Sequence, residues 1–288
     1  MKSTDICWAK LPLAEDLMEF DPAEIGPDGC ASPLPFSDSS FRPVSPDDGS
    51  SLALDGNRFV SRSGSSFPIV DERPILLPRR AIDCIKGNQL SISPESASDP
   101  FLQYLYFNIV KGSSGDINTP HGDVWYHRHL YRARKLLGDA SGVVLDVGCD
   151  DPKLSRSVFP AGVKYIGLDP VLGPRSEPSL VAMAEFLPLA DASVDGVVFL
   201  TSLDHVFDHH VAIDEAFRVL RPGGRLYLAT LIWTHRASLL HDNIHFHHFR
   251  QYEIEGVLRA FRIDHVTRYN WKNNDHRFGV YLAATKPY

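Results

Sequence analysis

The sequence predicts an α/β protein built on a doubly wound, mostly parallel, seven-stranded sheet, with a small β-rich extension near the N-terminus. Two observations predict this class. From about residue 125 onward, short apolar segments alternate with segments whose apolar residues recur at helical spacing, a pattern typical of a parallel sheet covered by helices on both faces. Residues 51–77 carry short apolar runs around a Ser/Gly turn, which indicates β structure in a small domain.

Length and composition fit a chain with one large and one small domain. The 288 residues are 43% hydrophobic, and the net charge of −7 lacks the basic surplus that nucleic-acid binding usually needs. No apolar run approaches ~18 residues and the N-terminus lacks the pattern of a signal peptide, so we expect no membrane span. Widely spaced cysteines without a C-x-x-C pair favour a reducing, cytoplasmic setting; they are Cys7, Cys30, Cys84 and Cys149.

The chain divides into four regions by composition. Residues 1–50 are acidic and rich in Pro, Ser and Gly, so we expect them to be largely irregular, with one short helix around Leu13–Phe20. Residues 51–80 are the expected β module, and residues 81–122 form a connector with a few apolar anchors. Residues 123–288 make up the main domain.

Within the main domain, apolar runs predict strands and helical periodicity predicts helices. The predicted strands are Gly142–Gly148, Lys164–Asp169, Ser179–Met183 (a weaker one), Val194–Leu200, Arg225–Thr230, Ile263–Tyr269 and Gly279–Thr285. The predicted helices are Trp125–Leu137, Leu154–Phe159, His210–Leu220 and Gln251–Ala260, with a turn at Pro222–Gly224.

Two of the predicted strands end in chemistry-bearing residues. Asp146 and Gly148 close the first strand, and Asp169 closes the second. Ligands of doubly wound sheets bind beyond the carboxyl ends of the strands, where an acid can accept both ribose hydroxyls of a nucleoside-containing cofactor. A glycine there lets the backbone come close to a ligand. We therefore expect Asp146 and Asp169 to lie on neighbouring strands and to grip one cofactor.

Six segments carry a family resemblance: VVLDVGC at 143–149, KYIGLD at 164–169, AEFLP at 184–188, DASVDGVV at 191–198, SLDHV at 202–206 and DEAFRVLRPGGRL at 214–226. In this order and spacing they resemble the class I methyltransferases, and in particular the branch that acts on small molecules. The resemblance covers roughly Trp125 to Lys286. It implies S-adenosyl-L-methionine as cofactor and a small molecule as acceptor.

The resemblance also implies roles for particular residues. Asp146, Gly148 and the backbone of Cys149 would lie beside the methionine part of the cofactor, and Asp169 would accept the ribose hydroxyls. The remaining contacts follow the later strands: Met183 and Ala184 along the adenine, and Leu200, Thr201 and Ser202 under the sulfonium, facing the acceptor. The family usually has Gly where this chain has Asp150 and Pro152, and non-Gly residues resist a left-handed backbone.

His205 is the candidate general base, because related small-molecule O-methyltransferases sometimes carry a catalytic His after this strand and imidazole titrates near neutral pH. The alternative is that Asp204 caps a helix and His205 packs against it. Asp204, His209 and His210 are weaker candidates for the base.

Two further features suggest metals, and we expect neither to bind one. A histidine-rich segment lacks the fixed spacing and partners of a metal site, so we interpret it as a substrate-facing loop or a partly buried surface. In the first case His245 or His248 could shape the acceptor pocket. The segment contains His235, His241, His245, His247 and His248. The 51–80 module resembles the second half of a small zinc ribbon without its cysteines. Packing of its apolar residues would then replace zinc; these are Phe59, Phe67, Ile69, Val70, Ile75 and Leu76.

Three hypotheses for function remain at this stage. The favoured one is methylation of a small molecule, with oxygen slightly preferred as the acceptor atom because of His205. An RNA methyltransferase is the second. The third is a non-catalytic interaction protein of methyltransferase fold, motivated by Asp150, Pro152 and the cysteine-less zinc-ribbon-like module. The acceptor and the oligomeric state cannot be deduced from the sequence.

Overall fold

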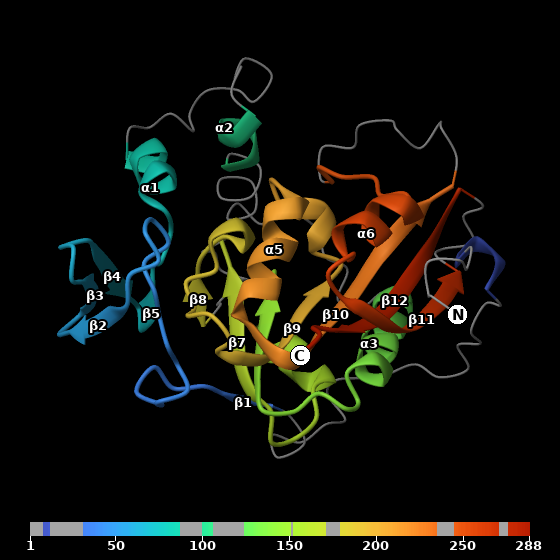
Figure 1. Cartoon of the computed structure of the whole chain (residues 1–288), viewed down its shortest axis with the longest axis horizontal. Helices are drawn as coiled ribbons and strands as arrows, with labels where there is room; N and C mark the ends of the chain where they lie inside the picture. The colour runs from blue at the N-terminus through green and yellow to red at the C-terminus, as the bar shows by residue number, and fades with distance from the viewer. Residues whose placement is uncertain are drawn as a thin grey trace.

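The computed structural model describes residues 8–11, 31–86, 100–105, 124–150, 152–170, 179–234, 245–270 and 276–288. These residues form one large sheet flanked by helices and one small sheet at the side (Figure 1). The large sheet has eight strands in the order β1-β7-β6-β9-β10-β12-β11, with β8 paired to β7. All pairings from β1 to β10 are parallel, and β10-β12 and β12-β11 are antiparallel.

The strands of the large sheet are β1 (Ser32–Pro33), β6 (Val143–Val147), β7 (Lys164–Asp169), β8 (Leu180–Val181), β9 (Val194–Leu200), β10 (Leu220–Trp233), β11 (Arg262–Asn270) and β12 (Arg277–Thr285). The helices are α1 (Arg79–Lys86), α2 (Pro100–Leu105), α3 (Val124–Leu136), α4 (Pro152–Ser155), α5 (His209–Val219) and α6 (Gln251–Val257). The small sheet contains β2 (Leu52–Asp55), β3 (Arg58–Ser61), β4 (Ser66–Val70) and β5 (Arg73–Pro74).

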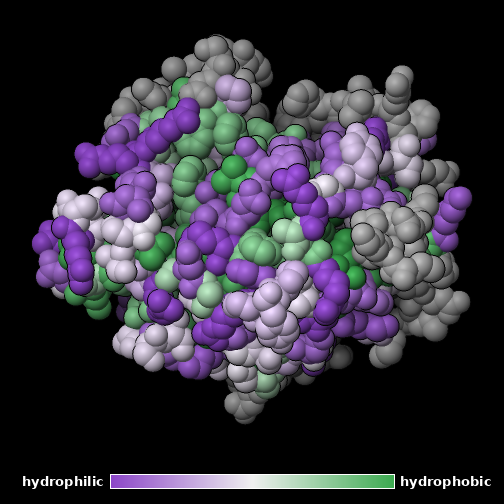
Figure 2. Space-filling model, in the orientation of Figure 1, coloured by the Kyte–Doolittle hydropathy of each residue, from purple (hydrophilic) through white to green (hydrophobic). Residues whose placement is uncertain are grey.

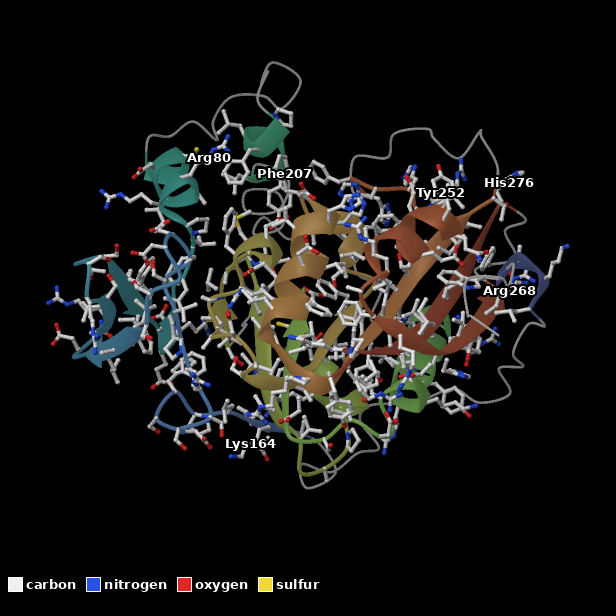
Figure 3. All side chains as sticks on the ribbon, in the orientation of Figure 1. Arg80, Lys164, Phe207, Tyr252, Arg268 and His276 are labelled. Atoms are coloured by element: carbon white, nitrogen blue, oxygen red, sulfur yellow. The ribbon has the colours of Figure 1, made fainter. Side chains whose placement is uncertain are left out.

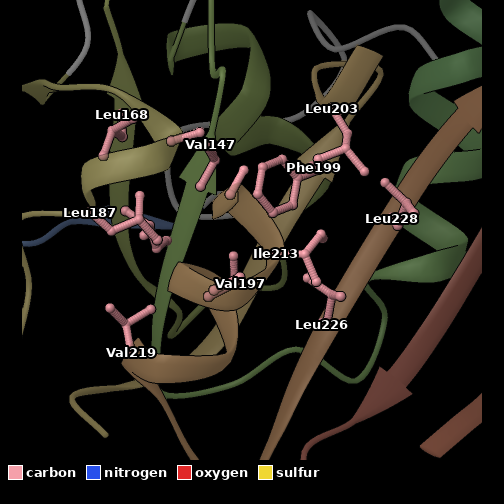
Figure 4. Close-up of a cluster of buried hydrophobic side chains, with 14 of the residues drawn as sticks. Val147, Leu168, Leu187, Val197, Phe199, Leu203, Ile213, Val219, Leu226 and Leu228 are labelled. Carbon is pink, nitrogen blue, oxygen red and sulfur yellow. The ribbon is translucent and has the colours of Figure 1, made fainter. Parts of the chain in front are cut away.

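The central strands are buried on both faces, which explains their nearly continuous apolar sequences. Successive side chains of a strand point to opposite faces. Accordingly, Val197 and Phe199 of β9 pack in one cluster with α5 and α6, whereas Val198 packs in another cluster with α3. The first of these clusters is the main core, and Figure 4 shows ten of its labelled side chains filling the space between α5 and the sheet.

Local signals explain where α5 begins. The carboxylate of Asp208 accepts the backbone N–H groups of His210 and Val211, at 2.9 and 3.2 Å. This N-cap satisfies two of the donors that a helix start leaves without intrahelical partners. The buried stripe of α5 then recurs at helical spacing at Ala212, Ile213, Ala216 and Val219.

The small sheet and the segments next to it contact the main domain through apolar packing and two bridges. Phe59, Phe67 and Leu76 are buried in the main core cluster. Bridges connect Pro43 with Leu189 and Ile75 with Val181. Val70, expected among the packing residues, is instead 46% exposed, because it lies near the end of β4 on the face away from the core.

The predicted fold class is confirmed, with three differences in detail. An eighth strand, β1, adds to β7 from the region expected to be irregular. The predicted turn at Pro222–Gly224 lies within β10, where the pairing register with β9 shifts between Leu220 and Arg225. The predicted helix Leu154–Phe159 is a short α4 followed by a 3₁₀ turn at Arg156–Val158. The helix expected at Leu13–Phe20 lies outside the described residues.

On the face shown in Figure 2, hydrophobic residues are visible near α2 and toward the middle, around α5, between hydrophilic ones. None of the helices in the described ranges combines the length and apolarity needed to cross a membrane.

Candidate active site

Asp146 and Asp169 lie on neighbouring parallel strands at one edge of the sheet, as the sequence predicted. Strand β6 pairs with β7 so that Asp146 stands opposite Gly167, and Asp169 follows two residues later. Because the period of a strand is two, Tyr165, Gly167 and Asp169 share one face. The side chains of Tyr165 and Cys149 occupy the space beside Gly167, where an added Cβ would lie 2.9 Å from both.

Asp146 is buried beneath this edge. The residue is only 1% exposed, and the hydroxyl of Tyr165 donates a 2.7 Å hydrogen bond to its Oδ2. Burial raises the pKa of Asp146 from 3.8 to about 7, and the negative charge of Asp169 adds to the rise, although the Tyr165 and Ser155 hydroxyls oppose it. The carboxyl group therefore titrates close to neutral pH.

The turn after β6 adopts a left-handed backbone at two positions. Gly148 has φ = 78°, and any Cβ on it would come well within 3.0 Å of the Ser202 Cβ. Asp150 has φ = 48° in place of the family's usual glycine, a conformation that Asp tolerates better than most residues. The backbone N–H of Asp150 donates to Asp169 Oδ2 at 3.1 Å, so this residue ties the turn to the second acid.

Cys149 contributes to the same turn through a backbone hydrogen bond. The N–H groups of Gly148 and Cys149 both donate to the Leu168 carbonyl, at 2.8 and 3.1 Å. The Cys149 thiol is 2% exposed and points into the cluster shared with α3, and burial raises its pKa well above the ordinary value. The close approach of this turn to β7 is therefore made by peptide groups, and the thiol is a core side chain.

Met183 and Ala184 lie beyond β8, at the beginning of a 3₁₀ helix that spans Ala184–Phe186. Met183 is fully buried, in one cluster with Phe101 and Tyr104 of α2. Burial raises the pKa of the Tyr104 phenol well above 10, and the charges of Glu185 and Asp169 raise it further.

The aromatic side chains of α2 were missed as site residues by the sequence analysis. Phe101 and Tyr104 contact Phe207 at ring distances of 5.4 and 5.8 Å, and Tyr104 contacts Phe246 at 5.5 Å. Figure 3 shows Phe207 pointing up toward α2. The only sequence signal was a set of apolar anchors in the connector, since the contacts join segments more than a hundred residues apart.

The end of β9 presents Leu200, Thr201 and Ser202, each partly exposed. Thr201 has φ = 57°, and its N–H donates to the Ala229 carbonyl at 2.8 Å, which continues the pairing of β9 with β10. The hydroxyl of Ser202 donates to the Val147 carbonyl, directly over the Gly148 turn. The chain thus leaves β9 through a strained residue, and such residues cluster at functional sites.

Immediately after this segment, Asp204 and His205 lie on a 3₁₀ helix (Leu203–His205). The Asp204 side chain is 6% exposed and stands 3.9 Å from His205 Nε2 and 3.8 Å from His245 Nε2. The rings of His205 and His245 have centroids 4.7 Å apart. Asp204 does not act as a side-chain cap of this helix, because the N-cap residue is Ser202.

His245 belongs to the histidine-rich segment, of which His235 and His241 lie outside the described residues. A pocket of about 290 Å³ opens here, lined by His209, His245, Phe246, His247, His248, Phe249 and Glu253. Burial lowers the pKa of His209 to about 4 and also lowers that of His247, so both rings are neutral at pH 7. The described part of the segment therefore borders a pocket.

Arg218 is the first arginine of the RVLRPGG motif, and its hydrogen bonds indicate a structural role for it. Its guanidinium donates to the carbonyls of Leu187 and Leu189 at 2.8 Å each, and to both carboxylate oxygens of Glu215. Glu215 in turn accepts the N–H of Leu187 at 2.9 Å. The motif thus ties the segment after Ala184 to α5, and so supports the adjacent candidate site.

Comparison with known proteins gives a consistent class. Residues 145–228 match the family model described as a methyltransferase domain. A protein of Mycolicibacterium smegmatis named "Probable S-adenosylmethionine-dependent methyltransferase" is 34% identical over 116 residues, which cover 37% of this chain and 45% of that protein. An O-methyltransferase of Aspergillus sclerotiorum, resE, is 34% identical over 112 residues, 34% of this chain and 42% of its own. The chain thus spans less than half the length of these curated relatives.

Among solved structures, the 1,6-didemethyltoxoflavin-N1-methyltransferase of Burkholderia thailandensis superposes with a TM-score of 0.47 at 16% identity, covering 82% of this chain and 98% of that one. A structural similarity at this level gives no information on the activity or the acceptor of this chain. The family match shows that the chain contains a methyltransferase domain at residues 145–228, and these residues form part of the mostly parallel large sheet.

Proposed function

We propose that this chain transfers a methyl group from S-adenosylmethionine to a small-molecule acceptor, and that the acceptor atom is an oxygen. One observation carries the proposal. The acids at the ends of β6 and β7 and the Asp204–His205 pair after β9 lie at the same edge of one parallel sheet, since β6 pairs with both β7 and β9. A cofactor held by the acids would therefore lie beside a group able to accept a proton.

The residues at this edge fit an adenosyl cofactor with two positive charges. Asp169 uses one oxygen to accept the Asp150 N–H, and a carboxylate has about four acceptor sites, so capacity remains for ribose hydroxyls. Met183 and Ala184 supply apolar surface for adenine, and the Gly148 turn allows close approach. Asp146 adds a carboxyl group beneath the turn, which carries negative charge once the pH exceeds its pKa of about 7. Leu200, Thr201 and Ser202 line the side where the acceptor would approach.

S-adenosylmethionine supplies a methyl group already activated on a sulfonium, so the protein acts chiefly by alignment. For a hydroxyl acceptor the chain must also remove a proton. Asp204 stands on the Nε2 side of His205, which favours the tautomer with hydrogen on Nε2 and leaves Nδ1 to accept the proton. The 3.9 Å separation is longer than a hydrogen bond, as is common before a substrate binds.

The small-molecule acceptor is supported by charge and by relatives. A net charge of −7 opposes binding to RNA, whose phosphates require counterion displacement by Lys and Arg. The Aspergillus sclerotiorum relative is named as an O-methyltransferase. We propose residues 123–288 as the catalytic domain and residues 51–80 as a module packed against it. The zinc-ribbon resemblance of that module and a cytoplasmic location remain predictions.

The proposal is tested by cofactor binding and by labelling. Calorimetry with S-adenosylmethionine should show one site per chain, and methyl-labelled cofactor should label members of a pool of phenols, alcohols and carboxylic acids. His205→Ala should lower kcat by about 100-fold or more and leave cofactor affinity unchanged, since a general base contributes about 10²–10⁴. His265→Ala, an exposed histidine on β11, is the matched control and should behave as the wild type.

Three outcomes would contradict the proposal in different ways. No cofactor binding would favour the interaction-protein hypothesis. Labelling of RNA with strong salt dependence would favour a nucleic-acid substrate. Equal rates for His205→Ala and the wild type, at every pH, would remove His205 as the base and with it the preference for oxygen.

A further inference from the structure

Asp204, His205 and His245 form a cluster whose chemistry goes beyond a catalytic dyad. One oxygen or nitrogen from each residue lies within 4.8 Å of the others. Two imidazoles and one carboxylate are a frequent ligand set for zinc and for other divalent transition metals. The cluster joins two segments about forty residues apart, so it could not be recognised from spacing in the sequence.

The carboxylate in this cluster is buried although one of its oxygens accepts no hydrogen bond within the described ranges. The Asp204 side chain is 6% exposed, and its Oδ1 accepts no hydrogen bond from any residue in the described ranges. A buried acceptor without a donor costs about 1–3 kcal/mol. Oδ1 stands 3.9 Å from His205 Nε2, and the second carboxylate oxygen, Oδ2, stands 3.8 Å from His245 Nε2. A cation between these atoms would satisfy the oxygen and use both nitrogens.

The backbone holds the two segments in this arrangement. The N–H groups of Phe246 and His247 both donate to the Asp204 carbonyl, at 2.9 and 3.1 Å. The His247 ring bonds the Val206 carbonyl at 2.9 Å. His245 is therefore fixed beside Asp204 before any ligand arrives, which limits the conformational entropy lost on binding.

The distances leave room for an ion after a small adjustment. Ligand bonds to zinc are about 2.0–2.2 Å, which places tetrahedral ligand atoms about 3.3 Å apart. The observed separations are 3.9 Å from Oδ1 to His205 Nε2 and 3.8 Å from Oδ2 to His245 Nε2, and one donor atom from each residue lies within 4.8 Å of the others. These distances exceed the tetrahedral value by about 0.5 to 1.5 Å, which rotation of the three side chains can close. His205 and His245 are 32% and 24% exposed, so water can complete the coordination and an ion can enter from solvent.

We propose that Asp204, His205 and His245 bind one divalent transition-metal ion of the zinc class, through a carboxylate oxygen of Asp204 and Nε2 of each histidine. This departs from the expectation that no residue of the chain binds a metal. Coordination through Nε2 requires the His205 proton to lie on Nδ1. A neutral imidazole has a single free lone pair, so a metal-bound His205 has none left to accept a proton.

Metal binding and proton acceptance by His205 therefore exclude one another. This consequence, but not the site itself, rests on the function proposed above. Zinc should slow methyl transfer to oxygen, and removal of zinc by a chelator should restore the rate. The site would act as a metal-sensitive switch on the base.

Binding is tested with the metal alone, on full-length protein without a histidine tag. Zinc calorimetry should give one tight site per chain, and Co²⁺ should produce visible absorption bands typical of nitrogen and oxygen ligands. His245→Ala and Asp204→Asn should weaken zinc binding on the order of 100-fold. His245→Cys, which replaces one zinc ligand with another, should retain tight binding, and His265→Ala should not change it.

Two results would overturn the site: equal zinc affinity for the wild type and His245→Ala, or equal loss for His245→Ala and His245→Cys with both variants folded by circular dichroism. The rate ratio with and without zinc tests the switch. The rate with zinc divided by the rate without zinc should be about one tenth or less for the wild type. For His245→Ala this ratio should stay near one. An enzyme with no methyl transfer at all would contradict the proposed function, and the binding data would still decide the metal site.

Discussion

The hydroxyl of Tyr165 donates a 2.7 Å hydrogen bond to Asp146 across the pairing of β7 with β6, within a region closed to solvent. The bond joins an acid of the candidate cofactor site to a core side chain. It partly offsets the cost of burying the carboxylate, yet the pKa of Asp146 is still raised to about 7. The site therefore contains a group whose charge changes near neutral pH and whose burial affects stability.

Asp146 should make the fold less stable at high pH. Its folded pKa of about 7 lies above the ordinary 3.8, so the folded state holds the proton more tightly between these values and stability falls as pH rises. Asp146→Asn removes this dependence. The free energy of unfolding of the variant relative to wild type should increase between pH 4 and 7, by about 4 kcal/mol at most, and level off above pH 8.

Urea unfolding at pH 5, 7 and 8.5 measures this difference. Tyr165→Phe is the companion variant: without the hydroxyl the pKa of Asp146 should rise further, and the loss of stability should extend to higher pH. A pH-independent difference between Asp146→Asn and wild type would show that Asp146 is not the titrating group.

Gly148→Ala should damage both stability and cofactor binding. The new Cβ would meet the Ser202 Cβ in a left-handed turn at φ = 78°. Gly56→Ala is the matched control, because Gly56 has φ = 60° and open space around it. We expect about 1 kcal/mol of destabilisation for Gly56→Ala from backbone strain alone, and about 3 kcal/mol or more for Gly148→Ala.

Thermal unfolding compares the two glycine variants, and calorimetry with S-adenosylmethionine should show weakened binding only for Gly148→Ala. If both variants lost the same stability and both bound cofactor normally, close packing of Ser202 on the turn would not be required.

Arg218→Lys should destabilise the domain although it keeps the charge. Lysine cannot reproduce the paired bonds to Glu215 together with those to the Leu187 and Leu189 carbonyls. The side chain is partly exposed, so solvent weakens the electrostatic part. We expect a loss of about 2 kcal/mol, mostly from unsatisfied carbonyls.

Chemical unfolding of Arg218→Lys and of the wild type measures this difference in the free energy of unfolding. Arg259→Lys, an exposed arginine just after α6, serves as the control and should change stability by less than about 0.5 kcal/mol. Equal stability of both variants and wild type would mean that the motif arginine has no structural role.

The sequence by itself determined the fold class and the cofactor class. Alternating apolar and amphipathic segments specify a parallel sheet, because strands buried on both faces must be apolar throughout, as in β6 and β9. Asp146, Gly148 and Asp169 could be singled out as candidate site residues because each stands at or next to the end of a predicted strand, in a motif order that resembles a known family. These are local signals, carried by neighbouring residues.

Only the tertiary structure decided how distant segments meet. Tyr104 contacts Phe246, Ser202 covers Gly148, and His245 stands beside Asp204. Asp150 takes a left-handed backbone where the family has glycine, since its N–H is held by Asp169. Such contacts follow from packing and from hydrogen bonds between elements far apart in the chain, and no periodicity in the sequence encodes them.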